Sequence, residues 1–176
     1  MLNLEKGAVL NLEKSDGSNI TNIRVGLAWD IADTNGTVDL DLFVIRKEDK
    51  KTAYFGDKVA IEWVRLSEDN TTGEWNWDDE FVKMDAKKTS DWTYVIWANI
   101  YNAVSKNQSF ALVKSAKATI YNDADNTVIA EFKLTDNGWD NTWILVAEIV
   151  DSWNNYELKT LGTFVKWDIN EIVASV

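Results

Sequence analysis

The stretch Val38-Asp39-Leu40-Asp41-Leu42-Phe43-Val44-Ile45 starts as a strict alternation of aliphatic and acidic residues and ends as an apolar run. Successive side chains of a β-strand point to opposite faces, so an alternation with a period of two predicts a strand. Leu40 and Leu42 then face a core, and Asp39 and Asp41 share the other face. The stretch therefore predicts a strand that carries two carboxylates on one side.

The same period recurs along the whole chain, with turn-forming residues such as 122–126 between the runs. Closely spaced short strands rich in β-branched and aromatic residues predict a mainly all-β fold, an antiparallel β-sandwich with one or two short helices. The helical pieces are expected near Ser105–Ser115 and over Ile169–Ser175. The expected strands are Leu2–Leu4, Val9–Leu12, Ile23–Leu27, Val38–Ile45, Val59–Trp63, Trp92–Tyr101, Ala118–Tyr121, Val128–Leu134, Trp143–Val150 and Leu161–Trp167.

The chain has 176 residues, enough for one domain with a proper core, and no linker or low-complexity segment divides it. We therefore expect a single domain over residues 1–176. Its ten Trp residues are a large number for this length, and buried aromatic rings remove much surface from water. Five of them are expected to pack in the core: Trp29, Trp63, Trp97, Trp143 and Trp167.

The composition excludes many kinds of site, because the sequence contains no Cys, His or Pro. Disulfides, Cys or His zinc sites, Cys nucleophiles and triads with a His base all need residues that are missing here. Phosphate-binding Gly-rich loops and Gly-x-Ser-x-Gly elbows are also missing. A glycosidase-type pair of carboxylates stays open, although any two acids of an acidic protein would fit it. The metal ligands that remain are oxygen atoms, which suit hard cations such as Ca²⁺ and Mg²⁺.

The charge balance argues against two classes of partner. With 18 Lys and Arg against 29 Asp and Glu, the formal net charge is −11, which disfavours nucleic acid and anionic membrane surfaces. No apolar run is long enough to predict a membrane span. The first residues lack the basic region and apolar run of a signal peptide, so we expect a cytoplasmic protein.

The segment from Glu68 to Glu80 contains six acidic residues and no basic one. Two carboxylates ~4 Å apart repel by about 4 kcal/mol at an effective dielectric constant near 20. Two interpretations stay open: a solvated loop that holds its carboxylates apart, or a loop that folds around a cation. Likewise, Asp39 and Asp41 are either the polar face of an amphipathic strand or two ligands to one ion. An EF-hand is excluded, because its obligatory Gly would fall on Glu74.

These motifs resemble the TerD family of tellurium-resistance and stress proteins. The matching pieces are Leu4–Gly7 with Leu12–Lys14, Val25–Asp30, Asp39–Asp41, Asp69–Glu74 running into Asp78–Glu80, Ile100-Tyr101 with Phe110, and Ala118–Asn122. The resemblance implies a β-sandwich that binds one or two Ca²⁺ ions through the two acidic segments. The ligands that it implies are Asp39, Asp41, Asp69, Asn70, Gly73 (through its carbonyl), Glu74, Asp78, Asp79 and Glu80, with Asp30 as a weaker candidate.

The chain departs from the family pattern at two places in the second acidic segment. Glu68 stands where relatives commonly have Gly, and Trp75-Asn76-Trp77 stands where they have small residues. Either Trp75 and Trp77 fold over the loop, or they form a contact surface for a protein partner. The resemblance implies a non-enzymatic calcium-binding protein of the stress and tellurite-resistance type that binds partners or acts as a scaffold. The alternative is a virion-associated structural component of a phage particle or another large assembly.

Overall fold

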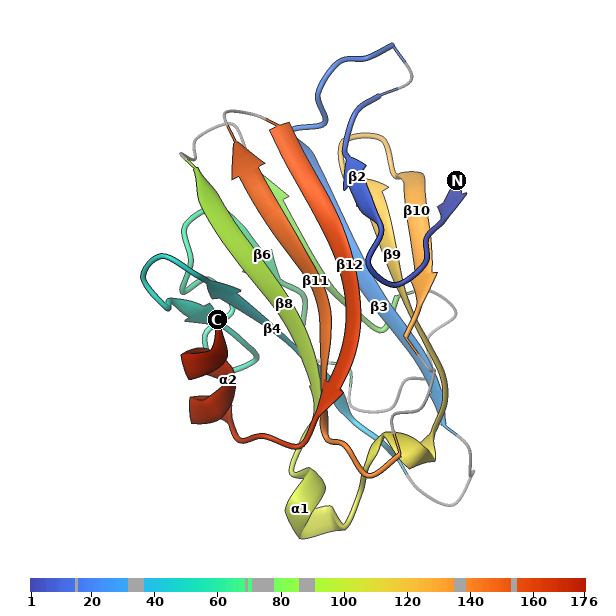
Figure 1. Ribbon diagram of the computed structural model, residues 1–176, viewed down its shortest axis with the longest axis vertical. Helices are drawn as coiled ribbons and strands as arrows, with labels where there is room; N and C mark the ends of the chain where they lie inside the picture. The colour runs from blue at the N-terminus through green and yellow to red at the C-terminus, as the bar shows by residue number, and fades with distance from the viewer. Residues whose placement is uncertain are drawn as a thin grey trace.

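The computed structural model describes residues 1–14, 16–31, 37–68, 70, 78–85, 91–134, 139–152 and 155–176. Two six-stranded β-sheets pack against each other, with short helices near one end and on one side (Figure 1). The predicted mainly-β sandwich is confirmed.

The first sheet, sheet A, has the strand order β1-β10-β9-β3-β7-β6. Its strands in that order are β1 (Leu2–Asn3), β10 (Thr127–Lys133), β9 (Val113–Asn122), β3 (Asn22–Ile31), β7 (Glu80–Asp85) and β6 (Val64–Leu66). All of its neighbouring strands are antiparallel except β1, which pairs with β10 in parallel.

The second sheet, sheet B, has the order β2-β12-β11-β8-β4-β5 and is antiparallel throughout. Its strands in that order are β2 (Val9–Asn11), β12 (Asn155–Val165), β11 (Trp143–Ser152), β8 (Trp92–Ile100), β4 (Leu40–Arg46) and β5 (Thr52–Ala53).

The first fourteen residues give a short edge strand to each sheet. The pentapeptide Leu-Asn-Leu-Glu-Lys occurs at 2–6 and again at 10–14. The first copy provides β1 at the edge of sheet A, and the second provides part of β2 at the edge of sheet B. Between them Gly7 has a φ of 83°, a left-handed conformation that favours glycine, and its N–H donates to the Thr160 carbonyl.

Strand β4 is buried on both of its faces. Leu40, Leu42 and Val44 belong to the core between the sheets. Phe43 and Ile45 belong to a second apolar cluster on the outer face of sheet B, together with Trp97, Trp143 and Ile172. Helix α2 (Ile169–Ser175) contributes Ile172 to that cluster, so the outer face is covered as well (Figure 1).

Helix α2 matches its predicted bounds. Its N-cap is Asp168, whose side chain accepts hydrogen bonds from the backbone N–H groups of Asn170 and Glu171, while Glu171 accepts from the Asp168 N–H. This reciprocal capping box satisfies backbone donors that the first turn leaves open.

The other helical region is shorter than the predicted range Ser105–Ser115. Helix α1 (Ala103–Lys106) is flanked by Asn102 and Asn107, both in the left-handed region, and a 3₁₀ turn (Phe110–Leu112) follows. Asn tolerates this conformation better than most residues, so the two Asn residues delimit the helix. The chain then enters β9 at Val113.

The predicted strand Val59–Trp63 is wrong. The strand begins at Val64, because Trp63 has a φ of 65° and a β-strand needs a negative φ. Ile61 is buried, whereas Val59 and Trp63 are exposed.

Three of the five Trp residues expected in the core are buried: Trp29, Trp97 and Trp143. The expectation is wrong for the other two, since Trp63 is 43% exposed and Trp167 is 40% exposed. Trp167 lies beyond the end of β12, which spans Asn155–Val165 and not the predicted Leu161–Trp167. Its ring still lies 6.4 Å from that of Trp97.

Within the described ranges, every helix is too short or too polar to cross a membrane.

Candidate functional site at the acidic segments

Asp39 and Asp41 lie at the start of β4 and are buried, with 6% and 2% of their surface exposed. Asp41 lies directly opposite Asn99 of β8, and the backbone carbonyl of Asp39 accepts a hydrogen bond from the Tyr101 N–H at 2.9 Å. Neither side chain is without partners. The strand alternation places both on the same side of β4 as Phe43, as the sequence predicts.

Asp79 lies just before the first residue of β7, and hydrogen bonds hold it against β3. Its Oδ2 atom accepts the Trp29 N–H at 3.0 Å, and its Oδ1 atom accepts the Asn70 side-chain amide at 3.0 Å. Its own N–H donates to the Leu27 carbonyl at 2.8 Å. Asp79 is 1% exposed and Asn70 is 5% exposed, so this carboxylate holds the second acidic segment on sheet A by buried hydrogen bonds.

Glu80 links the two acidic segments. It is the first residue of β7 in sheet A and is 5% exposed. Its Oε2 atom accepts the backbone N–H of Leu42 in β4 of sheet B at 2.8 Å. The side chain therefore spans the two sheets and reaches the residue that follows Asp41.

Asp78 lies on the side of β3 that faces away from the core. Alternate residues of β3 such as Val25 and Leu27 belong to the core, so Gly26 faces outward. A Cβ atom at Gly26 would lie 2.0 Å from the Asp78 carboxyl carbon, so this carboxyl group occupies the space that a side chain would fill. Burial raises the pKa of Asp78 above its ordinary value, against the opposing effects of the Tyr121 hydroxyl and the Arg24 guanidinium.

Asp30 also faces away from the core. It is exposed, and its Oδ2 atom accepts a hydrogen bond from the Ser115 hydroxyl at 2.8 Å. The described candidate residues thus divide into three groups. Asn70, Asp79 and Glu80 are buried near β3 and β7, with Glu80 reaching β4. Asp39 and Asp41 are buried on the other side of β4, the side of Phe43, and Asp30 and Asp78 lie on the outer face of sheet A.

The remaining candidates, Asp69, Gly73 and Glu74, lie outside the described residues, as do Trp75 and Trp77. Glu68, which departs from the family pattern, has an exposed carboxylate 2.6 Å from the Lys58 ammonium, and this contact lowers its pKa. Glu68 is therefore held by a surface ion pair with Lys58.

The described acidic residues include no group of three or more that could hold a metal ion by themselves. The donors that they do offer are carboxylate and amide oxygens, which suit Ca²⁺. A complete ligand shell for such an ion would therefore need donors from residues outside the described ranges.

Sequence reasoning missed the groups that position these acids. They are the backbone N–H groups of Trp29 and Leu42 and the open space above Gly26. A sequence does not show which backbone N–H groups will act as donors. Gly26 was a usable signal, because a lone glycine inside a strand often marks a close approach by another group.

Replacing Gly26 with Ala should lower the free energy of unfolding by about 1–3 kcal/mol, the usual cost of overpacking. The new methyl group would displace the Asp78 carboxyl group. Chemical denaturation of the single and double variants in a double-mutant cycle measures the coupling. In an Asp78→Ala background the same substitution should cost nothing or stabilise, since Ala suits a strand better than Gly. An equal cost in both backgrounds would contradict the contact.

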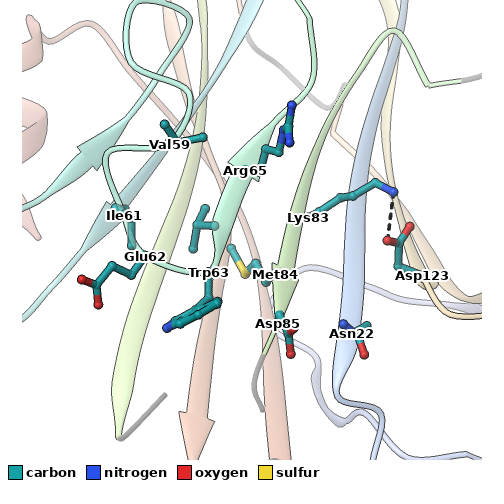
Figure 2. Close-up of a pocket in the computed structure, with 11 residues that line it drawn as sticks. Asn22, Val59, Ile61, Glu62, Trp63, Arg65, Lys83, Met84, Asp85 and Asp123 are labelled. Atoms are coloured by element: carbon teal, nitrogen blue, oxygen red, sulfur yellow. Dashed lines mark ion pairs between the residues drawn. The ribbon is translucent and has the colours of Figure 1, made fainter. Parts of the chain in front are cut away.

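A separate cavity of about 370 Å³ lies beside β6 and β7. Figure 2 shows Trp63 and Met84 on one side of it and the ion pair of Lys83 with Asp123, at 2.9 Å, on the other. Its charged lining residues have both signs, so the cavity favours no single class of ligand. None of the candidate acidic residues that the structure describes lines it.

Comparison with known proteins agrees with the fold and the motifs. The TerD domain model matches residues 1–175. The chain is 28% identical over 182 residues to stress response protein SCP2 of Bacillus subtilis (strain 168), which covers 92% of this chain and 91% of that protein. It is also 28% identical over 175 residues to tellurium resistance protein TerD of Serratia marcescens, covering 92% of this chain and 89% of that protein.

Two crystal structures share the fold. The protein of unknown function SAV2460 has a TM-score of 0.67 at 16% identity, covering 89% of this chain and 96% of that one. A homologue of TerD from Streptomyces coelicolor A3(2), SCO6318, has a TM-score of 0.63 at 14% identity, covering 88% and 95%. With a family model that spans nearly the whole sequence, the chain belongs to the TerD domain family.

Proposed function

We propose that this TerD domain is a non-enzymatic calcium-binding protein of the stress and tellurite-resistance type, and that the bound ion fixes a surface for a protein partner. The observation that carries the proposal is the burial of four carboxylates, those of Asp39, Asp41, Asp79 and Glu80, each at most 6% exposed. They come from two stretches far apart in the sequence, which the Glu80 hydrogen bond to Leu42 links.

Buried carboxylates are costly unless hydrogen bonds or a cation compensate them. Asp79 accepts hydrogen bonds from the Trp29 N–H and the Asn70 amide, and Glu80 accepts one from the Leu42 N–H. In the proposal Asp79 is a positioning residue that fixes Asn70 and Trp29. The direct ligands are Asp39 and Asp41, which β4 presents on one side.

The rest of the ligand shell is assigned to the second acidic segment. Ca²⁺ takes six to eight oxygen ligands, including carboxylates, side-chain amides and backbone carbonyls. Asp69, Glu74 and the Gly73 carbonyl supply such oxygens, and so does the amide oxygen of Asn70. A divalent ion among these groups would relieve their mutual repulsion.

The partner-binding role rests on the family and on the composition. Relatives carry the names stress response protein and tellurium resistance protein. With no Cys, this chain has no thiol to reduce tellurite. We therefore assign it a role in recognition, with Trp75 and Trp77 as the proposed contact residues.

Calorimetric titration of the chelator-treated protein with Ca²⁺ tests the proposal. The unaltered protein should bind one or two ions saturably, and the Asp39→Asn/Asp41→Asn double variant should bind at least about tenfold more weakly, because two charged ligands are lost. Asp30→Asn and Asp140→Asn, which each remove one charge from an exposed residue, serve as controls and should leave the affinity unchanged. Absence of binding, or an equal loss in the Asp140→Asn control, would refute the site. A loss in Asp30→Asn alone would move it to the outer face of sheet A.

A further inference from the structure

Asn99 is a polar residue near the end of β8, and its side chain faces away from the core. Ala98 and Ile100 on either side of it belong to the core between the sheets, so the strand alternation turns Asn99 to the outer face of sheet B. Trp97, its neighbour but one, belongs to the apolar cluster of residues on that face. An amide group in such surroundings needs polar partners, because its desolvation is otherwise uncompensated.

The oxygen atom of this amide group is enclosed and has no hydrogen-bond donor. Asn99 Oδ1 is shielded from solvent and accepts no hydrogen bond from the residues that the structure describes. The large majority of buried side-chain acceptors in proteins are satisfied, and an orphaned one calls for an explanation such as a bound ion.

The register of sheet B places a carboxylate beside this amide group. Asp41 of β4 lies directly opposite Asn99, and Trp143 of β11 is the register partner on the other side. Asp41 and Asn99 both face the outer side of the sheet. An ionised carboxylate offers no donor, and Trp143 belongs to the apolar cluster. A cation is the partner that suits both the amide oxygen and its neighbouring carboxylate.

The enclosure of the oxygen atom is compatible with such an ion. Ca²⁺ lies about 2.3–2.6 Å from its oxygen ligands, whereas a hydrogen-bonded water oxygen typically lies about 2.7–2.8 Å away. An oxygen that is too enclosed for water can therefore still bind an ion that neighbouring side chains share.

We infer that the side-chain oxygen of Asn99 is a further ligand of the calcium ion, next to Asp41. This inference rests on the proposed function, and it adds a donor from β8 to the donors from β4 and the second acidic segment. Ca²⁺ takes side-chain amide oxygens as well as carboxylates. A neutral ligand completes the coordination without adding repulsion among the carboxylates.

A purely structural role for Asn99 makes a different prediction in the absence of calcium. If the amide group is rotated by half a turn, its N–H₂ group donates a hydrogen bond to Asp41 and only positions that carboxylate. Loss of that bond lowers stability in chelator. A calcium ligand, in contrast, leaves an unpaired buried oxygen when no ion is bound, so its removal costs nothing in chelator.

Calorimetric titration with Ca²⁺ and thermal melts in chelator test the inference with two variants. Asn99→Leu should bind Ca²⁺ about tenfold more weakly, the scale of one lost polar contact, and should melt no lower than the unaltered protein in chelator. Asn99→Asp should bind Ca²⁺ at least about threefold more tightly, because affinity depends on the number of charged ligands. It should melt lower in chelator, because two carboxylates then repel each other.

The matched control is Asn155→Leu. The Oδ1 atom of Asn155 is also shielded and accepts no hydrogen bond from a described residue. Its register partner is Ser152, at the opposite end of β11 from Trp143, so this variant should leave calcium binding unchanged.

The outcomes separate this inference from the proposed function. Unchanged calcium binding by Asn99→Leu, a lower melting temperature of that variant in chelator, or weaker binding by Asn99→Asp would each overturn the role of Asn99 as a ligand and leave the calcium site in place. An equal loss of affinity in the Asn155→Leu control would overturn it too. Absence of calcium binding to the unaltered protein would overturn both.

Discussion

Chelator-treated protein should melt roughly 5–11 °C below the same protein in Ca²⁺ at 100 times its dissociation constant. A ligand at that concentration that binds only the folded state adds ~2.7 kcal/mol to the free energy of unfolding. For a chain of 176 residues, each kcal/mol raises the melting temperature by ~2–4 °C. The physical source is the relief of repulsion among the buried carboxylates of Asp39, Asp41 and the second acidic segment. Differential scanning calorimetry with and without chelator measures the shift.

Two further melting experiments test whether the stabilisation is specific for Ca²⁺ and for the proposed ligands. Mg²⁺ should raise the melting temperature less, because it demands six-coordinate geometry and gives up its water reluctantly. The Asp39→Asn/Asp41→Asn variant should show a smaller calcium shift than the unaltered protein. If the melts in chelator and in millimolar Ca²⁺ superimpose, the calcium proposal fails.

Replacing Asp79 with Ala should lower the free energy of unfolding by about 2–6 kcal/mol, with or without calcium. The substitution leaves two buried donors without their acceptor, the Trp29 N–H and the Asn70 amide. Each buried donor left unsatisfied costs about 1–3 kcal/mol. Denaturant titrations in chelator and in Ca²⁺ give the loss under the two conditions.

The matched control is Asp140→Ala, which removes a carboxylate that is 80% exposed and forms a surface ion pair with Lys166. That variant should change stability by no more than about 0.5 kcal/mol. If the Asp79→Ala loss occurs only in Ca²⁺, Asp79 acts through the ion and not as the positioning residue described above.

Strand β4 shows what local sequence determines and what it does not. The alternation in Val38–Ile45 predicts β4 and places Asp39 and Asp41 on one side of it, because strand geometry alone sets that pattern. It does not reveal that both faces of β4 are buried, because α2 covers the outer face from more than 120 residues further along the chain. Tertiary contacts of this kind have no local signal.

The acidic segment shows a second limit. Asp78, Asp79 and Glu80 are consecutive, and the sequence treats them as equivalent ligands, yet the structure turns them toward three different surroundings. Asp78 fills the space above Gly26, Asp79 binds Trp29, and Glu80 reaches Leu42. Their directions depend on where the chain meets sheet A, and no periodic pattern encodes that point. For the same reason β7, which begins at Glu80, was not predicted.

Trp63 shows a third limit. The spacing of Val59, Ile61 and Trp63 fits a strand, but the left-handed backbone at Trp63 excludes a strand that includes this residue. A bulky residue rarely adopts this conformation, so propensity predicts against it. The strand begins only at the next residue.

The short strands β1 and β2 have a consequence for the integrity of the protein. They pair with β10 and β12, the outermost long strands of the two sheets. Proteolytic loss of the first fourteen residues would leave backbone N–H and C=O groups of both strands open to pairing with other molecules. The shortened chain would also lose the buried Leu12 from the core, and its characteristic defect would be edge-to-edge polymerisation.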